Sequence, residues 1–240
     1  MRNFTGTRRV LPTILAVTAL LVIGVVAISL LATRRGHSEA SPTRPSPTPS
    51  TSPVPIPSGA ITLVQGARLA DGVEIGYPHT TVGAVSAAAE YLDAVASTLD
   101  PDYAASVMRI AGDPANTSLP TNLATSTVKL RAALQLPTSG PLEPPTTFQT
   151  TAQMYQLRGV SADEVLVLLL TDSTFINARG GTAQTTGVFP IQMRWTDGDW
   201  KLRAVGHTGQ DYSGLAATPD TRAAASQGWL PLIAATGGTS

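Results

Sequence analysis

Residues 195–202 read WTDGDWKL, and this stretch decides the fold more than any other part of the chain. Asp197-Gly198 is a dipeptide favoured in two-residue hairpin turns, where both positions need a positive φ angle. Apolar residues alternate on either side of it, as in strands with one buried face. A turn at this dipeptide predicts three cross-strand pairs on one face of the sheet: Trp195 with Trp200, Met193 with Leu202, and Ile191 with Ala204.

The segments before this hairpin also have the pattern of strands. Residues 187–195 alternate, and Gly180-Gly181 turns the chain before them. The apolar run at residues 165–170, within 164–178, is too short to cross a bilayer. It predicts a strand buried on both faces, with a helix as the alternative. Residues 148–160 favour an extended conformation, so a meander of about four antiparallel strands is expected.

Earlier in the chain, the apolar period is that of helices. From Thr80 or Thr81 to Leu99, apolar residues recur every three or four positions, which predicts a helix with one buried face. Asp100-Pro101 predicts the start of a second helix. A third is expected to begin near residues 118–121 and to stop before Pro137. The predicted fold class is α+β, with two to three helices packed on a curved antiparallel sheet.

The first part of the chain is apolar enough to cross a membrane. Residues 10–32 carry no charged side chain, and arginine pairs flank them at 8–9 and 34–35. As a helix this run reaches roughly 35 Å, against about 30 Å for a hydrocarbon core. We expect a transmembrane helix over residues 10–33 that contacts membrane lipid. A cleaved signal is the alternative, but two arginines directly follow the small residues where cleavage would occur.

A proline-rich linker follows the predicted span. Seven prolines lie among Ser and Thr in residues 41–59, a composition that favours polyproline II and is common in extracellular stalks. A cytoplasmic spacer is the alternative. The predicted single-pass cell-membrane protein has five parts: a cytoplasmic N-terminus (1–9), a transmembrane helix (10–33), a stalk (34–59), an extracytoplasmic α+β domain (60–215) and a C-terminal tail (216–240). Trp229 predicts that this tail packs back onto the domain.

Cysteine content and charge narrow the function classes. The chain has no cysteine, which excludes thiol nucleophiles and thiolate metal sites. Five arginines and no acid precede residue 36, and 11 basic residues face 16 acidic ones from there on. A domain with a net charge of about −5 is a poor nucleic-acid binder, so no nucleic-acid partner is expected. The three histidines lack the spacing of a zinc site, and no phosphate-binding loop is present.

Helices followed by a curved sheet that ends in this hairpin resemble the nuclear-transport-factor-2-like (NTF2-like) cone fold. The residues that carry the likeness are Trp195, Asp197, Gly198, Trp200, Lys201 and Leu202. With one membrane span and an exported domain, the chain also resembles the VirB8-type and TcpC-type assembly proteins of bacterial conjugation systems. Residues 76–80 (GYPHT), which run into an Ala-rich helix, are similar to anchored proteins of actinobacteria. The resemblance covers roughly residues 76–206 and carries over no catalytic residue.

These observations predict a non-catalytic scaffold. Its exported domain would bind protein partners or a second copy of itself within a conjugative transfer or type IV secretion apparatus. No catalytic residue, metal ligand or cofactor is expected. Two alternatives stay open: a module that binds or senses a small ligand, and an isomerase-type enzyme that uses polar residues of the helical block, namely Glu90, Tyr91, Asp93 and Tyr103.

Two sets of residues are candidates for binding. In the predicted register Arg194 lies opposite Lys201 on the outer face of the hairpin, with Arg203 next along. They form a basic stripe for an acidic partner, with an ordinary solvated sheet face as the alternative. His207 and Asp211 follow the last strand and are a candidate pocket or loop site for acid–base chemistry. His79 is expected to pack at the start of the first helix.

Overall fold

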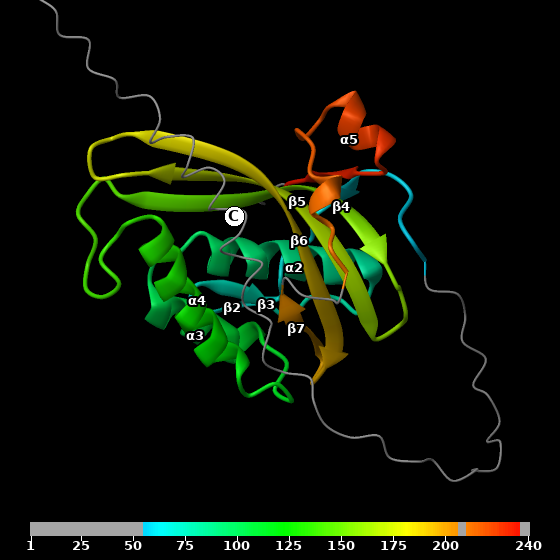
Figure 1. Ribbon diagram of the computed structural model, residues 1–240. Coiled ribbons are helices and arrows are strands. Elements are labelled where there is room, and N and C mark those ends of the chain that lie inside the picture. The colour runs from blue at the N-terminus through cyan, green and yellow to red at the C-terminus, as the bar shows by residue number, and fades with distance from the viewer. Residues whose placement is uncertain (1–54, 206–209, 236–240) are drawn as a thin grey trace, which may run out of the picture.

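Helices and sheet form two layers in the computed structural model, which describes residues 55–205 and 210–235. Three helices lie against one face of a curled sheet whose strand order is β1-β8-β4-β5-β6-β7 (Figure 1). The helices are α2 (Thr81–Ala96), α3 (Pro101–Ala111) and α4 (Leu119–Ala133). The predicted α+β class and the curved antiparallel sheet are confirmed.

The first two helices begin where their capping residues predict. The Thr80 hydroxyl accepts from the Gly83 amide at 3.0 Å, and the Asp100 carboxylate accepts from the Asp102 amide at 2.9 Å. Gly83 is required for close approach, because a Cβ there would lie 2.0 Å from the Pro78 carbonyl oxygen. Helix α2 therefore enters the core with its first turn fixed against the preceding segment.

Four strands form the predicted meander. They are β4 (Thr147–Arg158), β5 (Glu164–Ile176), β6 (Thr182–Thr196) and β7 (Asp199–Val205), and each is antiparallel to the next. The β6–β7 turn has φ angles of 54° at Asp197 and 76° at Gly198, as the Asp-Gly dipeptide predicts. Trp195 pairs with Trp200 and Met193 with Leu202, which confirms the predicted register next to the turn.

The register prediction is wrong beyond Leu202. Ile191 pairs with Val205 instead of Ala204, because the pairing shifts by one residue between Gln192 and Met193. Arg203 is the additional residue on β7, and it forms a β-bulge. The two-residue turn predicts the pairs that lie next to it. The bulge further along the strand could not be predicted, because the extra residue does not change the alternation of apolar residues in the sequence.

Strand β5 is buried on both faces, as predicted. Val165, Val167 and Leu169 belong to the main core with α2, whereas Leu168 and Leu170 pack in a separate cluster with Met154 and Trp229. Because side chains alternate along a strand, one apolar run supplies both clusters. We refer to these as the helix face and the tail face of the sheet.

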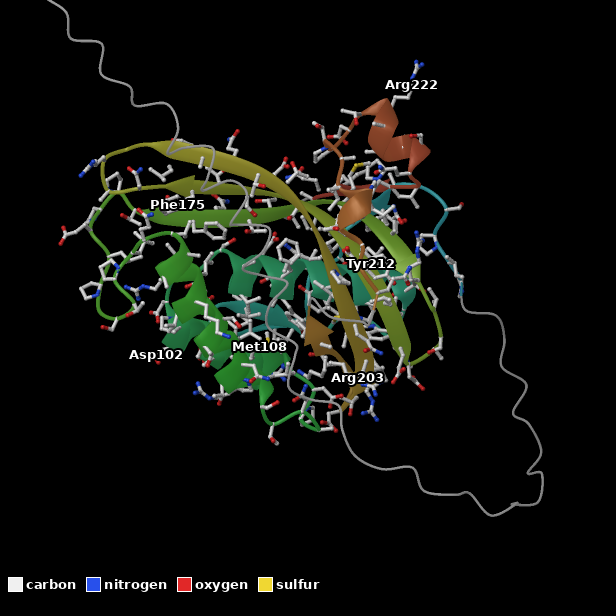
Figure 2. The ribbon with its side chains drawn as sticks, viewed as in Figure 1. Asp102, Met108, Phe175, Arg203, Tyr212 and Arg222 are labelled. Carbon is white, nitrogen blue, oxygen red and sulfur yellow. The ribbon has the colours of Figure 1, made fainter. Side chains whose placement is uncertain are left out.

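The tail face is covered by the C-terminal segment. This segment contains the 3-10 turn η2 (Ser213–Leu215), the short helix α5 (Arg222–Ser226) and strand β8 (Leu230–Ile233). Figure 2 shows α5 on the side of the sheet opposite to the helices, with Arg222 pointing away from the sheet. Tyr212 packs against the tail-face cluster. Trp229 is 2% exposed, and its indole N–H donates to the Leu215 carbonyl at 2.9 Å. The predicted packing of the tail is confirmed.

The sheet is wider than the predicted four strands. β8 pairs antiparallel with β4 and parallel with β1 (Ile61–Thr62). The folded domain therefore continues past residue 215 and includes the strand of the tail. The segment before α2 also contains an antiparallel hairpin of β2 (Arg68–Ala70) and β3 (Val73–Ile75). These strands are too short for their alternation to be seen in the sequence.

In residues 55–205 and 210–235, no helix combines the length and apolar character that a bilayer crossing requires. The predicted transmembrane helix, residues 10–33, lies outside the described part of the chain, as does most of the predicted stalk.

Candidate functional site

The start of α2 is joined to the β6–β7 hairpin through aromatic side chains. The His79 ring stacks on Trp195 with centroids 4.1 Å apart and an interplanar angle of 9°, and the Trp200 indole N–H donates to the Pro78 carbonyl at 3.0 Å. His79 Nε2 also lies 3.0 Å from an Asp163 carboxylate oxygen. The prediction that His79 packs at the helix start is confirmed.

The Asp199 carboxylate, next to the hairpin turn, accepts hydrogen bonds from three groups close to these aromatic side chains. One carboxylate oxygen accepts from the amides of Tyr77 at 3.0 Å and Trp200 at 2.8 Å, and the other accepts from the Lys201 ammonium at 3.2 Å. The carboxylate is buried and therefore needs these donors. Asp199 ties β7 to the segment before α2, a role that sequence reasoning missed because residues 77 and 199 are far apart in the chain.

Tyr91 lies fully buried on α2 next to this group. Its ring meets Tyr77 edge-on at 6.0 Å, and its hydroxyl has no hydrogen-bond partner among the described residues. Burial raises the pKa of Tyr91 far above its usual value, and the negative charges of Asp199 and Glu90 raise it further. The hydroxyl is therefore held neutral, and a neutral buried phenol cannot act as a base.

Two carboxylates approach each other between β3 and α2. Glu90 accepts from the Glu74 amide at 3.2 Å, while the Glu74 carboxylate accepts from the Gly66 amide at 2.9 Å. Burial raises the pKa of Glu90; the hydrogen bond from Glu74 lowers it and the Glu74 charge raises it again. These contacts hold the β2–β3 hairpin on the helix.

Asp93 carries a carboxyl group whose pKa is strongly raised. It is half-buried between α2 and β4, where it accepts from the Ala152 amide at 3.1 Å. Burial raises its pKa to about 7, against the opposing effect of that hydrogen bond and with a smaller contribution from Glu90. A carboxyl group with a pKa near neutrality is the usual mark of acid–base chemistry.

The residues of the isomerase alternative do not meet at one site, although the Glu90 charge acts on both Tyr91 and Asp93. Asp93 contacts β4, whereas Tyr91 interacts with Asp199 on β7, and three strand positions separate these strands in the sheet. Tyr103 lies on α3 and is 37% exposed. Asp93 and Tyr91 are two positions apart on one helix, so their side chains point in divergent directions.

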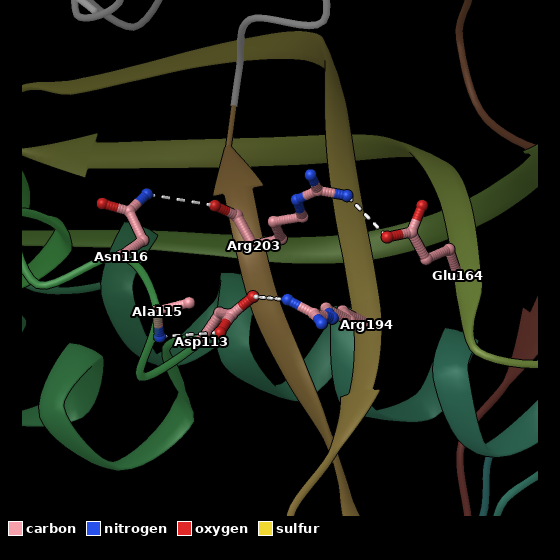
Figure 3. A network of polar contacts seen from close by, with 6 residues as sticks. All are labelled: Asp113, Ala115, Asn116, Glu164, Arg194 and Arg203. Atoms are coloured by element: carbon pink, nitrogen blue, oxygen red, sulfur yellow. Dashed lines mark hydrogen bonds and ion pairs between the residues drawn. The ribbon is translucent and has the colours of Figure 1, made fainter. Parts of the chain in front are cut away.

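Each basic residue of the predicted stripe pairs with an acidic side chain, and Figure 3 shows the pairs of Arg194 and Arg203. The Arg194 guanidinium lies 3.3 Å from the Asp113 carboxylate, Lys201 lies 3.2 Å from Asp199, and Arg203 lies 2.6 Å from Glu164. Lys201 also donates to the Ile110 carbonyl at 2.9 Å. Arg194 does face Lys201 across the strands, as predicted, but the surface is not an open basic stripe. Its binding of an acidic partner stays a prediction.

The candidate loop site is only partly described. His207 lies outside the described residues, so its pairing with Asp211 stays a prediction. The fully exposed Asp211 carboxylate accepts from the Ser213 amide at 2.8 Å, and this hydrogen bond lowers the pKa of Asp211. In this position Asp211 starts the 3-10 turn η2. Within the same described ranges, no group of three or more metal-ligating side chains is close enough to hold an ion.

Residues 66–229 match the family described as Domain of unknown function (DUF8175). The chain belongs to this family. The DUF8175 match runs from Gly66, two residues before β2, to Trp229, so it includes the hairpin, α2 and the tail as far as Trp229. Residues 216–229 of the tail are therefore part of the DUF8175 domain, and β8 follows directly after the match.

Among solved structures, the DUF8175 chain is similar to a protein from Xanthomonas campestris described as a calcium/calmodulin dependent protein kinase II association domain. The TM-score is 0.37 at 12% identity, over 58% of this chain and 89% of the other. No curated protein sequence matches the chain.

Proposed function

We propose that this chain is a non-catalytic scaffold that is anchored in the membrane and binds protein partners with its DUF8175 domain. The observation that carries this proposal is the divergence of Asp93 and Tyr91, two of the side chains that the isomerase alternative would use. Each is engaged at a different junction between α2 and the sheet, so neither shares a substrate position with the other.

The remaining polar side chains support the same conclusion. Asp199, Glu90 and Asp113 each accept from the backbone of another element or from a basic side chain. Charged groups used in this way hold the elements of the domain together. A domain whose elements are held together in this way is suited to presenting a fixed surface to a partner.

The location and the apparatus are also part of the proposal. The charge-free run at residues 10–32 and the proline-rich residues 41–59 would anchor the domain and hold it outside the membrane. Helices under a curled sheet are the arrangement that the NTF2-like resemblance implies (Figure 1). On that basis we propose a VirB8-like place in a conjugative transfer or secretion apparatus.

The test is cross-linking of the full-length protein in intact cells, followed by purification of the membrane fraction. We expect external protease to remove the DUF8175 domain, and the cross-linked products to contain defined components of a transfer apparatus. Asp93→Asn and Tyr91→Phe should leave these products unchanged. Recovery of the protein from the culture medium without its first forty residues, or a membrane protein that cross-links to no apparatus component, would overturn the proposal.

An isomerase-type activity is the second candidate, and one observation favours it: the pKa of Asp93 near 7. Under this alternative Asp93 would be a catalytic base and Asp93→Asn would abolish turnover, whereas Tyr91→Phe would have little effect because Tyr91 faces β7. Loss of partner binding in Asp93→Asn with a correctly folded domain would instead mean that the α2–β4 junction shapes the binding surface.

A further inference from the structure

Strand β6 has neighbours on both sides for only part of its length. β5 pairs with residues 182–194 of β6, whereas β7 pairs only with residues 191–196. No strand among the described residues pairs with the other side of residues 182–190, which we call the β6 rim. Figure 1 shows it as the outer border of the long β5–β6 hairpin. An unpaired strand border is a template for the addition of another strand.

The direction of the backbone groups on the β6 rim follows from two observations. In an antiparallel ladder, residues that point their N–H and C=O to one neighbour alternate with residues that point to the other. The Trp195 amide donates to the Asp163 carbonyl at 2.7 Å, and the β5–β6 register has no shift. Odd-numbered residues of β6 therefore point to β5, and even-numbered ones point outward. Pro190, which has no N–H, stands at an even position, in agreement.

The β6 rim has no charge that would keep another strand away. No charged residue lies between Arg179 and Arg194, and four residues of the rim are β-branched: Thr182, Thr185, Thr186 and Val188. Natural sheets usually protect such borders with lysine or other charged residues. In a twofold antiparallel pair the residue on the axis faces its own copy, so a charge at that position would face a like charge, which is destabilising. A neutral, β-branched rim is therefore compatible with a copy of itself.

The β6 rim is also held in place before any partner arrives. At the hairpin turn the Asn177 side chain accepts from the amides of Arg179 at 2.9 Å and Gly181 at 3.0 Å. On the helix side of the hairpin, Phe175 packs with Leu99, Leu134 and Phe148 (Figure 2). A preformed strand loses little conformational freedom on association, which favours binding.

We propose that two copies of this chain associate through the β6 rim. Residues 182–188 of one copy pair antiparallel with the same residues of the second about a twofold axis near Thr185, and the two sheets become continuous. The inference rests on the proposed scaffold function and names one of its contacts. The start of the described chain, at residue 55, lies at the opposite end of the domain from the β5–β6 turn (Figure 1).

Cysteine cross-linking tests the pairing, because a chain without native cysteine can form disulfides only between introduced residues. Single cysteines are placed at residues 183–187 of the full-length protein, in intact cells under mild oxidation. We expect a dimer that is strongest for Thr185→Cys, since residues in a non-hydrogen-bonded pair have Cα atoms about 4.5 Å apart, within disulfide range. Asp102→Cys, at an exposed position on α3, is the control and should stay monomeric.

A backbone substitution separates strand pairing from accidental collision. Gln184→Pro removes one outward N–H and no bond to β5, whereas Gln184→Thr keeps the N–H and is the matched control. Each substitution is made in the Thr185→Cys variant. We expect Gln184→Pro to lower the dimer yield about tenfold and Gln184→Thr to leave it unchanged. Circular dichroism and the melting temperature of each purified variant show that it is folded.

Three results would overturn the pairing: no dimer at any of the five positions, an equal dimer for Asp102→Cys, or equal yields for Gln184→Pro and Gln184→Thr. If apparatus components are still cross-linked in any of these cases, the scaffold function stands and only self-pairing fails. If the dimer forms while no apparatus component is captured, self-pairing stands and the proposed scaffold function fails.

Discussion

The two faces of strand β5 are covered in very different ways. On the helix face, three helices and the β2–β3 hairpin contribute to one large core that includes Trp200 and Tyr91. On the tail face, a C-terminal segment with little regular structure closes a small cluster around Trp229. Both tryptophans are almost fully buried, at 1% and 2% exposure. The difference shows that the two faces of one strand can be buried equally well by different means: a layer of helices covers one face, and a segment anchored by one tryptophan covers the other.

The helix face should be the more sensitive to loss of its tryptophan. Trp200→Ala removes a ring inside the main core and the hydrogen bond to the Pro78 carbonyl. We expect the free energy of unfolding to fall by about 3–5 kcal/mol, measured by urea denaturation. Trp200→Phe, which keeps most of the packing, should lose about half as much. A change near zero for Trp200→Ala would mean that the hairpin does not pack as described.

The tail face should lose less stability and lose it locally. Trp229→Ala empties the centre of a smaller cluster, which can collapse more readily, so we expect about 2–3 kcal/mol. Hydrogen exchange should rise in residues 210–233 while α2 stays protected. Uniform loss of protection across both faces would show that the tail is as much a part of the cooperative core as the helices are.

Asp93 adds a pH-dependent test of the helix face, because burial there raises the pKa of its carboxyl group strongly. Its pKa is about 7 in the folded chain, raised mainly by burial, and returns to about 3.8 on unfolding. The unfolded state therefore binds fewer protons between these values, and stability falls as pH rises from about 4 to 7. Asp93→Asn should remove this decline and gain on the order of 2 kcal/mol at pH 8. If the stability of Asp93→Asn declined with pH as that of the unsubstituted protein does, the raised pKa of Asp93 would be contradicted.

The smallest effects should come from the ion pairs at the hairpin. Arg194→Ala leaves the buried Asp113 with only its backbone donor Ala115, and we expect a loss of about 1 kcal/mol. Arg203→Ala breaks a pair in which both partners are partly exposed, so the change should stay below about 0.5 kcal/mol. Thermal melts at low and high salt would check both. Equal losses would mean that burial of Asp113 contributes little.

Much of the fold could be predicted because its signals are local. The Asp197-Gly198 turn, the Thr80 and Asp100 caps and the double-faced run of β5 each depend on residues within a few positions of one another. The register failed only at Arg203, where an inserted residue does not alter the pattern of apolar residues. Strand β8 was missed because a four-residue strand becomes recognisable only beside the strands that it joins.

The candidate site was less predictable because its contacts connect distant parts of the chain. Arg194, Lys201 and Arg203 look like an open basic stripe when only the hairpin is considered. Asp113 and Glu164, which neutralise two of them, come from the end of α3 and the start of β5. No sequence spacing indicates such pairs.

By itself, the sequence determined the helix starts, the hairpin turn, the two-sided burial of β5 and the charge-free β6 rim. These are properties of short segments, set by backbone preference and the alternation of apolar side chains. Tertiary structure alone decided the pKa of Asp93, the pairing of the basic residues and the closure of the tail face by Trp229. Each of these depends on which distant groups exclude water from a side chain or donate hydrogen bonds to it, and only folding brings those groups together.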